Sequence, residues 1–236
     1  MNANEEKLSR SRYKNGKVED TITLEDFQDF LIEAKNYREW RREMYGDDWR
    51  FKDINVCALF SVLYYTGLRV AEVVGDIKRK YETKRYGTRR SSGHTGILKE
   101  HVTIEENHIR IRSDKPLKHG KREAPLYVPK DKPGVDEIIE VWEKTERGER
   151  LFPISKTYAW RFVTDVTQRA HDKNDELVRV YPHFFRLNRV SRWCEHKDTT
   201  IKELKDWFGW RDPETIASYL AKGGKSTKRM ADRDHW

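Results

Sequence analysis

Two arginines of this 236-residue chain stand in short strings that could act on a phosphate group. Arg69 lies in Tyr65-Thr-Gly-Leu-Arg-Val-Ala-Glu72, and Arg186 ends His183-Phe-Phe-Arg. When a phosphodiester is attacked, negative charge grows on its non-bridging oxygens, and a guanidinium offers them a planar, permanently charged pair of donors. Taken singly, each arginine is better explained as a surface or structural residue, because the chain has 48 Lys and Arg. The surrounding strings favour the phosphate role.

The neighbours of these arginines could support the same chemistry. His183 and Arg186 are three residues apart, so on a helical turn their side chains point the same way and can reach one phosphate. Alone, the pair also fits a helix start after Pro182. Glu72 follows Arg69 by three residues and can brace its guanidinium, although a surface salt bridge is the ordinary alternative.

A third string, Phe208-Gly-Trp-Arg-Asp-Pro-Glu-Thr-Ile-Ala-Ser-Tyr219, ends in a tyrosine. Asp212 as N-cap and Pro213 at the first helical position predict a short helix that contains Tyr219. Tyr219 also belongs to an apolar stripe of that helix, so a core position is its ordinary interpretation. As a nucleophile, its phenol, with a free pKa near ~10, would have to lose its proton, which nearby cations would assist.

In this order and spacing, the strings resemble the tyrosine recombinase (phage integrase) family. The family pattern joins an arginine segment, a hairpin lysine, a histidine–arginine segment and a glycine turn ahead of a tyrosine. All of these elements occur here, and we expect a catalytic domain over residues 23–221. The resemblance implies cleavage and rejoining of double-stranded DNA through a 3′-phosphotyrosyl link at Tyr219, with no metal, nucleotide or other cofactor.

The resemblance also assigns the other catalytic roles. Lys115 takes the place of the general acid that protonates the departing 5′-oxygen, with Lys118 and Lys121 of the same hairpin as alternatives. His183 would handle protons and hydrogen-bond the phosphate. Trp210 stands where many relatives have histidine, and its indole N–H can donate to a phosphate oxygen but cannot carry a proton.

Two features depart from the family pattern. Residues 76–96 form an apparent insertion, whose part from Lys78 to Arg90 has seven Lys and Arg against Glu82 alone, a net +6. This part is either a solvated loop or a DNA contact. The expected DNA-binding residues are Lys78, Arg79, Lys80, Lys84, Arg85, Arg89, Arg90, Lys118 and Lys121. Relatives also carry a core-binding domain ahead of this region, whereas here we expect a flexible leader over residues 1–22 and a basic tail over 222–236.

Helical periodicity dominates the chain. Thr23 and Asp26 form a capping-box pattern ahead of apolar residues at helical spacing. The apolar run 54–65 ends at Thr66-Gly67 and predicts the central core helix. Further helical patterns cover 68–74, 138–142, 158–166, 184–194, 201–208 and 213–221.

The pattern changes to period two between Val102 and Val128, which predicts three short antiparallel strands. The first two strands are joined through residues 105–107, and the last two through a long basic hairpin over 113–123. The expected fold class is therefore α+β, mainly helical, with a small three-stranded antiparallel sheet.

Composition narrows the possible functions. Lys and Arg number 48 against 40 Asp and Glu, and the resulting net charge of +8 favours a polyanionic partner. The two cysteines have no partner motif, so a zinc or redox site is not expected. The longest nearly apolar stretch, 56–65, is too short to span a bilayer, and the N-terminus lacks the apolar region of a secretory signal. We expect a cytoplasmic, DNA-associated protein with no membrane partner.

Three functions remain open at this point. The sequence predicts a site-specific recombinase or integrase of a mobile element, working with further protomers in a tetrameric synapse on DNA. A type IB topoisomerase-like relaxing enzyme would share the chemistry, and a non-catalytic DNA-binding protein could keep the fold. A covalent protein–DNA adduct would separate the enzymes from the binding protein.

Overall fold

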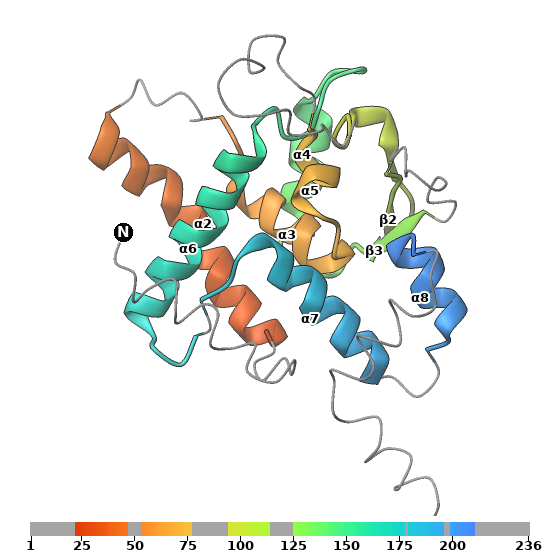
Figure 1. Cartoon of the computed structure of the whole chain (residues 1–236). Coiled ribbons are helices and arrows are strands. Elements are labelled where there is room, and N and C mark those ends of the chain that lie inside the picture. The colour runs from red at the N-terminus through yellow and green to blue at the C-terminus, as the bar shows by residue number, and fades with distance from the viewer. Residues whose placement is uncertain are drawn as a thin grey trace, which may run out of the picture.

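Helix α3 (Val56–Thr66) runs through the centre of the fold, and all of its residues are buried (Figure 1). The computed structural model describes residues 22–46, 53–76, 94–113, 125–177, 179–195 and 199–210. The predicted end of the helix is confirmed, because Gly67 closes it in the left-handed conformation, with φ 61°. A helix that is apolar on every side needs cover all round, and the other elements supply it.

Among the described elements, the longer helices that pack around α3 are α2 (Leu24–Tyr45), α5 (Val135–Lys144), α6 (Lys156–Lys173) and α7 (Pro182–Glu195). Helix α2 begins at the predicted capping box. The Thr23 N–H donates to the Asp26 carboxylate over 2.7 Å, and the Asp26 N–H donates to Thr23 Oγ1 over 3.0 Å. Among the described helices, none is long and apolar enough to cross a membrane.

Ile22, which the sequence placed at the end of the leader, is packed against α7. Ile22 is buried, its N–H donates to Asn188 Oδ1 over 3.0 Å, and its carbonyl accepts from Asn188 Nδ2 over 3.3 Å. These two bonds attach the start of α2 to α7. The packed part of the chain therefore includes Ile22.

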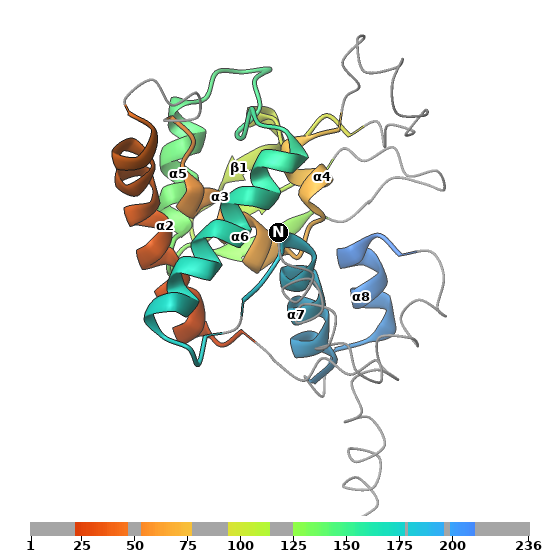
Figure 2. The same cartoon turned by 60° about the vertical axis from the view of Figure 1, so that its left-hand side comes forward.

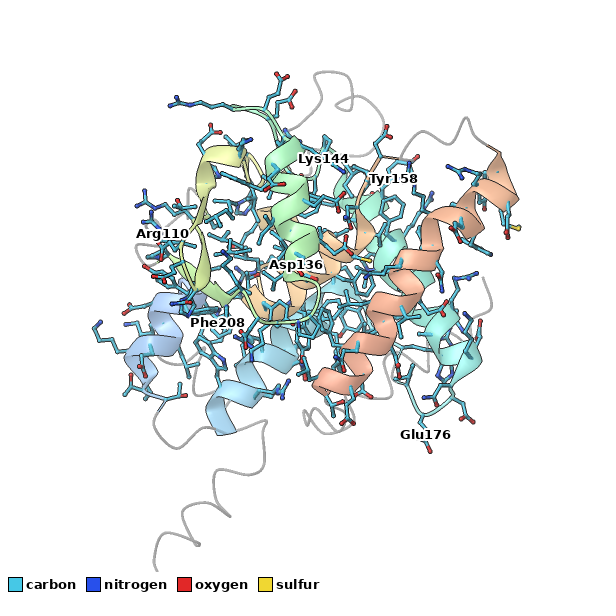
Figure 3. All side chains as sticks on the ribbon, turned by 180° about the vertical axis from the view of Figure 1, so that it is seen from behind. Arg110, Asp136, Lys144, Tyr158, Glu176 and Phe208 are labelled. Carbon is cyan, nitrogen blue, oxygen red and sulfur yellow. The ribbon has the colours of Figure 1, made fainter. Side chains whose placement is uncertain are left out.

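The three predicted strands are present and antiparallel, in the order β1 (Val102–Ile104), β2 (His108–Ile111) and β3 (Leu126–Pro129). Ile109 pairs with both Ile104 and Val128, which fixes the register across the sheet. Alternate side chains face the core, while Arg110 lies on the other face, at the edge of the molecule in Figure 3, and pairs with Glu105 over 2.8 Å. The structure is thus mainly helical with a small three-stranded antiparallel sheet.

The two ends of the segment 77–93 meet beside helix α4 (Val70–Val74). The Asp76 N–H donates to the His94 carbonyl over 2.8 Å. The neighbouring backbones are so close that a Cβ on Gly75 would lie 2.7 Å from the Thr95 carbonyl oxygen. The basic residues predicted to bind DNA in this segment lie outside the described residues.

The short helix α8 (Ile201–Phe208) lies beside α7 and is packed by a small hydrophobic cluster of its own (Figure 2). Val190, Leu204, Phe208 and Trp210 are the buried members, with Trp193 and Trp207 packed against them. Thr200 and Glu203 form a capping box, and Gly209 ends the helix at φ 62°. The helix therefore spans the predicted residues. Its apolar side chains pack with those of α7 into a second, smaller hydrophobic cluster.

Candidate active site

The turn between α3 and α4 presents Arg69. The Leu68 N–H donates to Thr66 Oγ1 over 3.1 Å, and the Arg69 N–H donates to Glu72 Oε2 over 2.8 Å. Both bonds hold the backbone of the turn, while the Arg69 side chain keeps 42% of its surface exposed. The backbone of Arg69 is thus held in place, while its side chain is partly exposed to solvent.

The Glu72 carboxylate lies between two guanidiniums. Its side chain is 2% exposed, and Oε2 is 3.7 Å from Arg69 Nη1 and 3.9 Å from Arg186 Nη1. A buried carboxylate needs such compensation, because burial removes the water that stabilises its charge. The spacing in the sequence suggested the contact with Arg69 but could not show the contact with Arg186, which comes from a distant helix.

Arg186 is completely buried. Its Nη1 donates to the Gly67 carbonyl over 3.0 Å and its Nη2 to the Phe208 carbonyl over 3.1 Å. The guanidinium carbon also lies 4.8 Å from the Phe208 ring and 5.3 Å from the Trp210 ring. Arg186 therefore joins α7 to the turn ahead of Arg69 and to the end of α8, whose Phe208 is labelled in Figure 3.

His183 lies in the first turn of α7 and is exposed to solvent. Its pKa is lowered from the ordinary value, first by the partial burial of the ring and then by the positive charges of Arg186 and Arg69. Although three residues separate His183 and Arg186, one is exposed and the other buried. His183 is therefore neutral at pH 7, and the positive charges of both arginines disfavour its protonation.

Trp210 packs directly after the end of α8. Its side chain is 8% exposed and is stacked on Phe208, with ring centroids 4.8 Å apart. Its backbone N–H donates to the Lys205 carbonyl over 3.1 Å, which extends the helix end by one bond. Trp210 thus contacts the ring system that covers Arg186.

The structure brings together five of the predicted residues, Arg69, Glu72, His183, Arg186 and Trp210, from α4, α7 and the end of α8. Tyr219, Lys115, Lys118 and Lys121 lie outside the described residues. Sequence reasoning missed Trp207, and it gave no role to Phe208 of the third string, yet both contact the turn before Arg69. Their only signal in the sequence is their place just before the Gly209-Trp210 turn.

The arrangement is suited to an anion. Two guanidiniums and a neutral imidazole converge on one region, and the exposed end of Arg69 can donate to a ligand there. Within the described ranges, no group of three or more His, Cys, Asp or Glu side chains could hold a metal ion. What these residues can do chemically is to bind a phosphate, stabilise added negative charge and move a proton.

No family model and no curated protein sequence matches the chain. Among solved structures, the chain is similar to XerA recombinase, with a TM-score of 0.56 and 14% sequence identity. The match covers 92% of this chain but 64% of that chain, so this chain spans less than two thirds of its length. At this identity the similarity concerns the fold alone. The helices and three-stranded sheet therefore share the fold of the matching part of a recombinase.

Proposed function

We propose that the chain is a DNA strand-cleaving and rejoining enzyme of the tyrosine recombinase type. One observation carries the proposal: Arg69 and Arg186 converge on the buried carboxylate of Glu72, with His183 within the field of both. Such a cluster of positive charge is what a phosphodiester requires as its negative charge grows during attack. The fold similarity to XerA recombinase supports the same proposal.

The two arginines would act differently. Arg69 has the exposed guanidinium and would donate directly to the non-bridging oxygens. Arg186 is covered, and two carbonyls already accept from it. Its positive charge is nevertheless felt at the site, since it lowers the pKa of His183. In this arrangement Arg186 stabilises the transition state through its field, at a position that costs no rearrangement during the reaction.

His183 and Trp210 would complete the phosphate site. Neutral His183 has one N–H to donate to a phosphate oxygen and one nitrogen that can accept a proton. Trp210 is buried against Phe208, so its proposed contribution is to pack the end of α8 against Arg186. The proton relay of the site would then depend on His183 and on the hairpin lysine.

The covalent steps are assigned to Tyr219 and Lys115. The Tyr219 oxygen would attack phosphorus as its proton passes to His183, and the bond from phosphorus to the 5′-oxygen would break as Lys115 protonates that oxygen. A 3′-phosphotyrosyl bond replaces the phosphodiester, and the reverse attack by a 5′-hydroxyl restores it. No oxidant, nucleotide or metal enters this balance.

The recombinase fold also supports the finer proposal of site-specific recombination on double-stranded DNA, with further protomers in a synapse. A protein with this activity would be located on DNA. A relaxing enzyme would rejoin each strand to its own partner, whereas a recombinase joins strands of two duplexes. Products that combine two labelled duplexes would therefore favour recombination, and relaxation without such products would favour the topoisomerase alternative.

The proposal is tested with suicide DNA substrates, in which a nick near the cleavage point lets the short fragment that carries the free 5′-hydroxyl diffuse away. Tyr219→Phe should abolish the covalent protein–DNA adduct while DNA affinity stays near that of the wild type, because the phenol oxygen contributes chemistry rather than charge. Tyr181→Phe is the matched control and should still form the adduct. An adduct that persists in Tyr219→Phe, or maps to another tyrosine, would contradict the assignment.

A further inference from the structure

Trp207 contacts the active-site turn from a helix that carries none of the arginines. Its indole Nε1–H donates to the Thr66 carbonyl over 2.8 Å. Thr66 is the last residue of α3, and the last four carbonyls of a helix have no partner within it. The bond from α8 therefore satisfies a carbonyl that the helix itself cannot pair.

The next carbonyl along the chain is held in the same way from α7. Arg186 Nη1 donates to the Gly67 carbonyl over 3.0 Å. Two consecutive carbonyls thus accept from two different helices, and the chain reaches Arg69 two residues later. Because Arg69 begins α4 directly after this turn, the position of its guanidinium depends on both bonds.

The orientation of the Trp207 ring is fixed by its neighbours. It packs against Trp193, with centroids 4.3 Å apart, and the Arg189 guanidinium lies 5.0 Å from the Trp193 ring and 5.8 Å from the Trp207 ring. Tryptophan suits this place because it combines a large apolar surface with one donor. Phenylalanine could fill the same space but could not bond Thr66.

We propose that Trp207 is a positioning residue, which holds the Thr66–Gly67 turn to α8 and thereby places Arg69 against the substrate phosphate. The inference rests on the proposed function. Helix α8 leads in sequence to Trp210 and then to Tyr219. The bond between Trp207 and Thr66 therefore couples the phosphate-binding arginine to the element that precedes the nucleophile.

Trp207→Phe isolates the hydrogen bond, because it keeps an aromatic ring in the cluster and removes the donor. Misplacing a catalytic group by about 1 Å can cost about 100-fold in rate, so we expect cleavage to slow by about 10- to 100-fold with unchanged DNA affinity. Trp193→Phe is the matched control. It alters the same aromatic cluster without removing the bond to Thr66, and its cleavage rate should change less than about threefold.

A methylphosphonate substrate shows whether the effect passes through Arg69. Replacing one non-bridging oxygen by methyl removes the negative charge that Arg69 would meet. Arg69→Ala and Trp207→Phe should therefore both slow the ordinary substrate and leave cleavage of the methylphosphonate nearly unchanged. The double variant should be no slower than Arg69→Ala alone. Equal slowing of both substrates by Trp207→Phe, or full additivity with Arg69→Ala, would overturn the positioning role.

Hydrogen exchange gives a readout that needs no activity. The amides of Leu68 and Arg69 bond within the turn and should exchange faster in Trp207→Phe than in Trp193→Phe. Equal exchange in the two variants would overturn the inference. If the wild-type protein forms no adduct on any substrate, the proposed function fails, and the exchange experiment alone decides whether Trp207 holds the turn.

Discussion

The guanidinium of Arg186 is a full positive charge with no exposed surface, balanced by two carbonyl oxygens and the carboxylate of Glu72. Removing one partner of a buried ion pair costs more than the pair itself contributes, because the other charge stays behind without compensation. Glu72 is the carboxylate partner of both Arg69 and Arg186, so removing its charge would leave buried Arg186 without this compensating charge. We therefore expect Glu72 to contribute to stability as well as to the proposed activity.

Glu72→Gln tests this at the level of stability. Glutamine keeps the shape of the side chain and an oxygen that can accept from the Arg69 N–H, but it removes the negative charge. We expect the free energy of unfolding to fall by about 3 kcal/mol, measured by denaturant titration. Glu140→Gln, which breaks an exposed pair with Lys144, should cost less than about 0.5 kcal/mol. Similarly small losses in both variants would contradict the compensating role of Glu72.

His183 predicts the pH dependence of the proposed reaction. Its folded pKa lies below the ordinary value, so the neutral ring predominates at neutral pH and is lost only as the pH falls through the lowered pKa. At limiting DNA concentration, which reports the free enzyme, the cleavage rate should be independent of pH near neutrality and fall as the pH drops through the lowered pKa of His183.

His183→Gln is the control for this profile. Glutamine cannot titrate, so the variant should be slow but independent of pH over the same range. A wild-type rate that rises as the pH falls would mean that the protonated ring is the active form.

At the scale of elements, the turn between α3 and α4 is where α3, α4, α7 and α8 meet. Helix α3 ends there, α7 and α8 each donate one hydrogen bond to it, and α4 begins directly beyond it. Gly67 makes the arrangement possible in two ways. Its φ of +61° suits a residue without a Cβ, and an added Cβ would lie 3.0 Å from Phe208 Cε1 and 3.1 Å from Arg189 Cβ.

Gly67→Ala should therefore lower stability by more than backbone strain alone. Left-handed backbone costs about 1–2 kcal/mol for a residue with a Cβ, and the contacts with Phe208 and Arg189 add to it. Gly148→Ala is the matched control, because Gly148 also has positive φ, at +88°, but has nothing within 4 Å of an added Cβ. Denaturant titration should show a larger loss of unfolding free energy for Gly67→Ala than for Gly148→Ala. Equal losses would mean that Phe208 and Arg189 move aside for the added methyl group at little cost.

The elements that the sequence predicted well are those with local stop and start signals. Gly67 ends α3, and Thr200 and Gly209 bound α8, because caps act through residues next to the helix. Helix α2 begins at its predicted capping box, but no end was predicted for it, and it extends through Tyr45. There Arg41 bonds Asp165 of α6 over 2.7 Å, a contact between distant segments that no local pattern contains.

The same distinction applies to the candidate site. The strings identified Arg69, His183 and Arg186 by type and spacing, but the burial of Arg186 and the bond from Trp207 to Thr66 depend on how α7 and α8 pack. Side-chain spacing on one helix does not say which neighbour will cover it. The sequence thus predicts which residues gather, while packing decides which of them meet a ligand.

At the scale of the whole molecule, the hydrophobic packing of the described residues has two parts. A large cluster is built around α3, and a smaller one joins α7 to α8.

The net charge of the chain is +8, and the expected partner is a polyanion. Electrostatic binding of this kind releases counterions from DNA, so the affinity should fall steeply as salt rises.

Replacing Arg85, Arg89 and Arg90 by Gln tests whether the segment 77–93 contributes to that binding. The slope of log affinity against log salt should flatten by up to ~0.9 for each phosphate that the variant no longer neutralises, with little change in sequence preference. Replacing Lys35, Lys132 and Lys144 by Gln removes the same charge from other parts of the chain and should leave the slope of log affinity against log salt unchanged. An unchanged slope in the arginine variant would mean that the segment is only solvated.

The junction at Asp76 and His94 has a consequence for how the protein can vary. Its backbone bond is reinforced by Lys156 of α6, which pairs with the Asp76 carboxylate over 2.8 Å, so both ends of the segment 77–93 are anchored to the body independently of what lies between them. The entropy of closing such a segment grows only with the logarithm of its length, by about 0.6 kcal/mol per doubling. The chain can therefore gain, lose or exchange sequence at this point by insertion or grafting, while α4 and Arg69 keep their place.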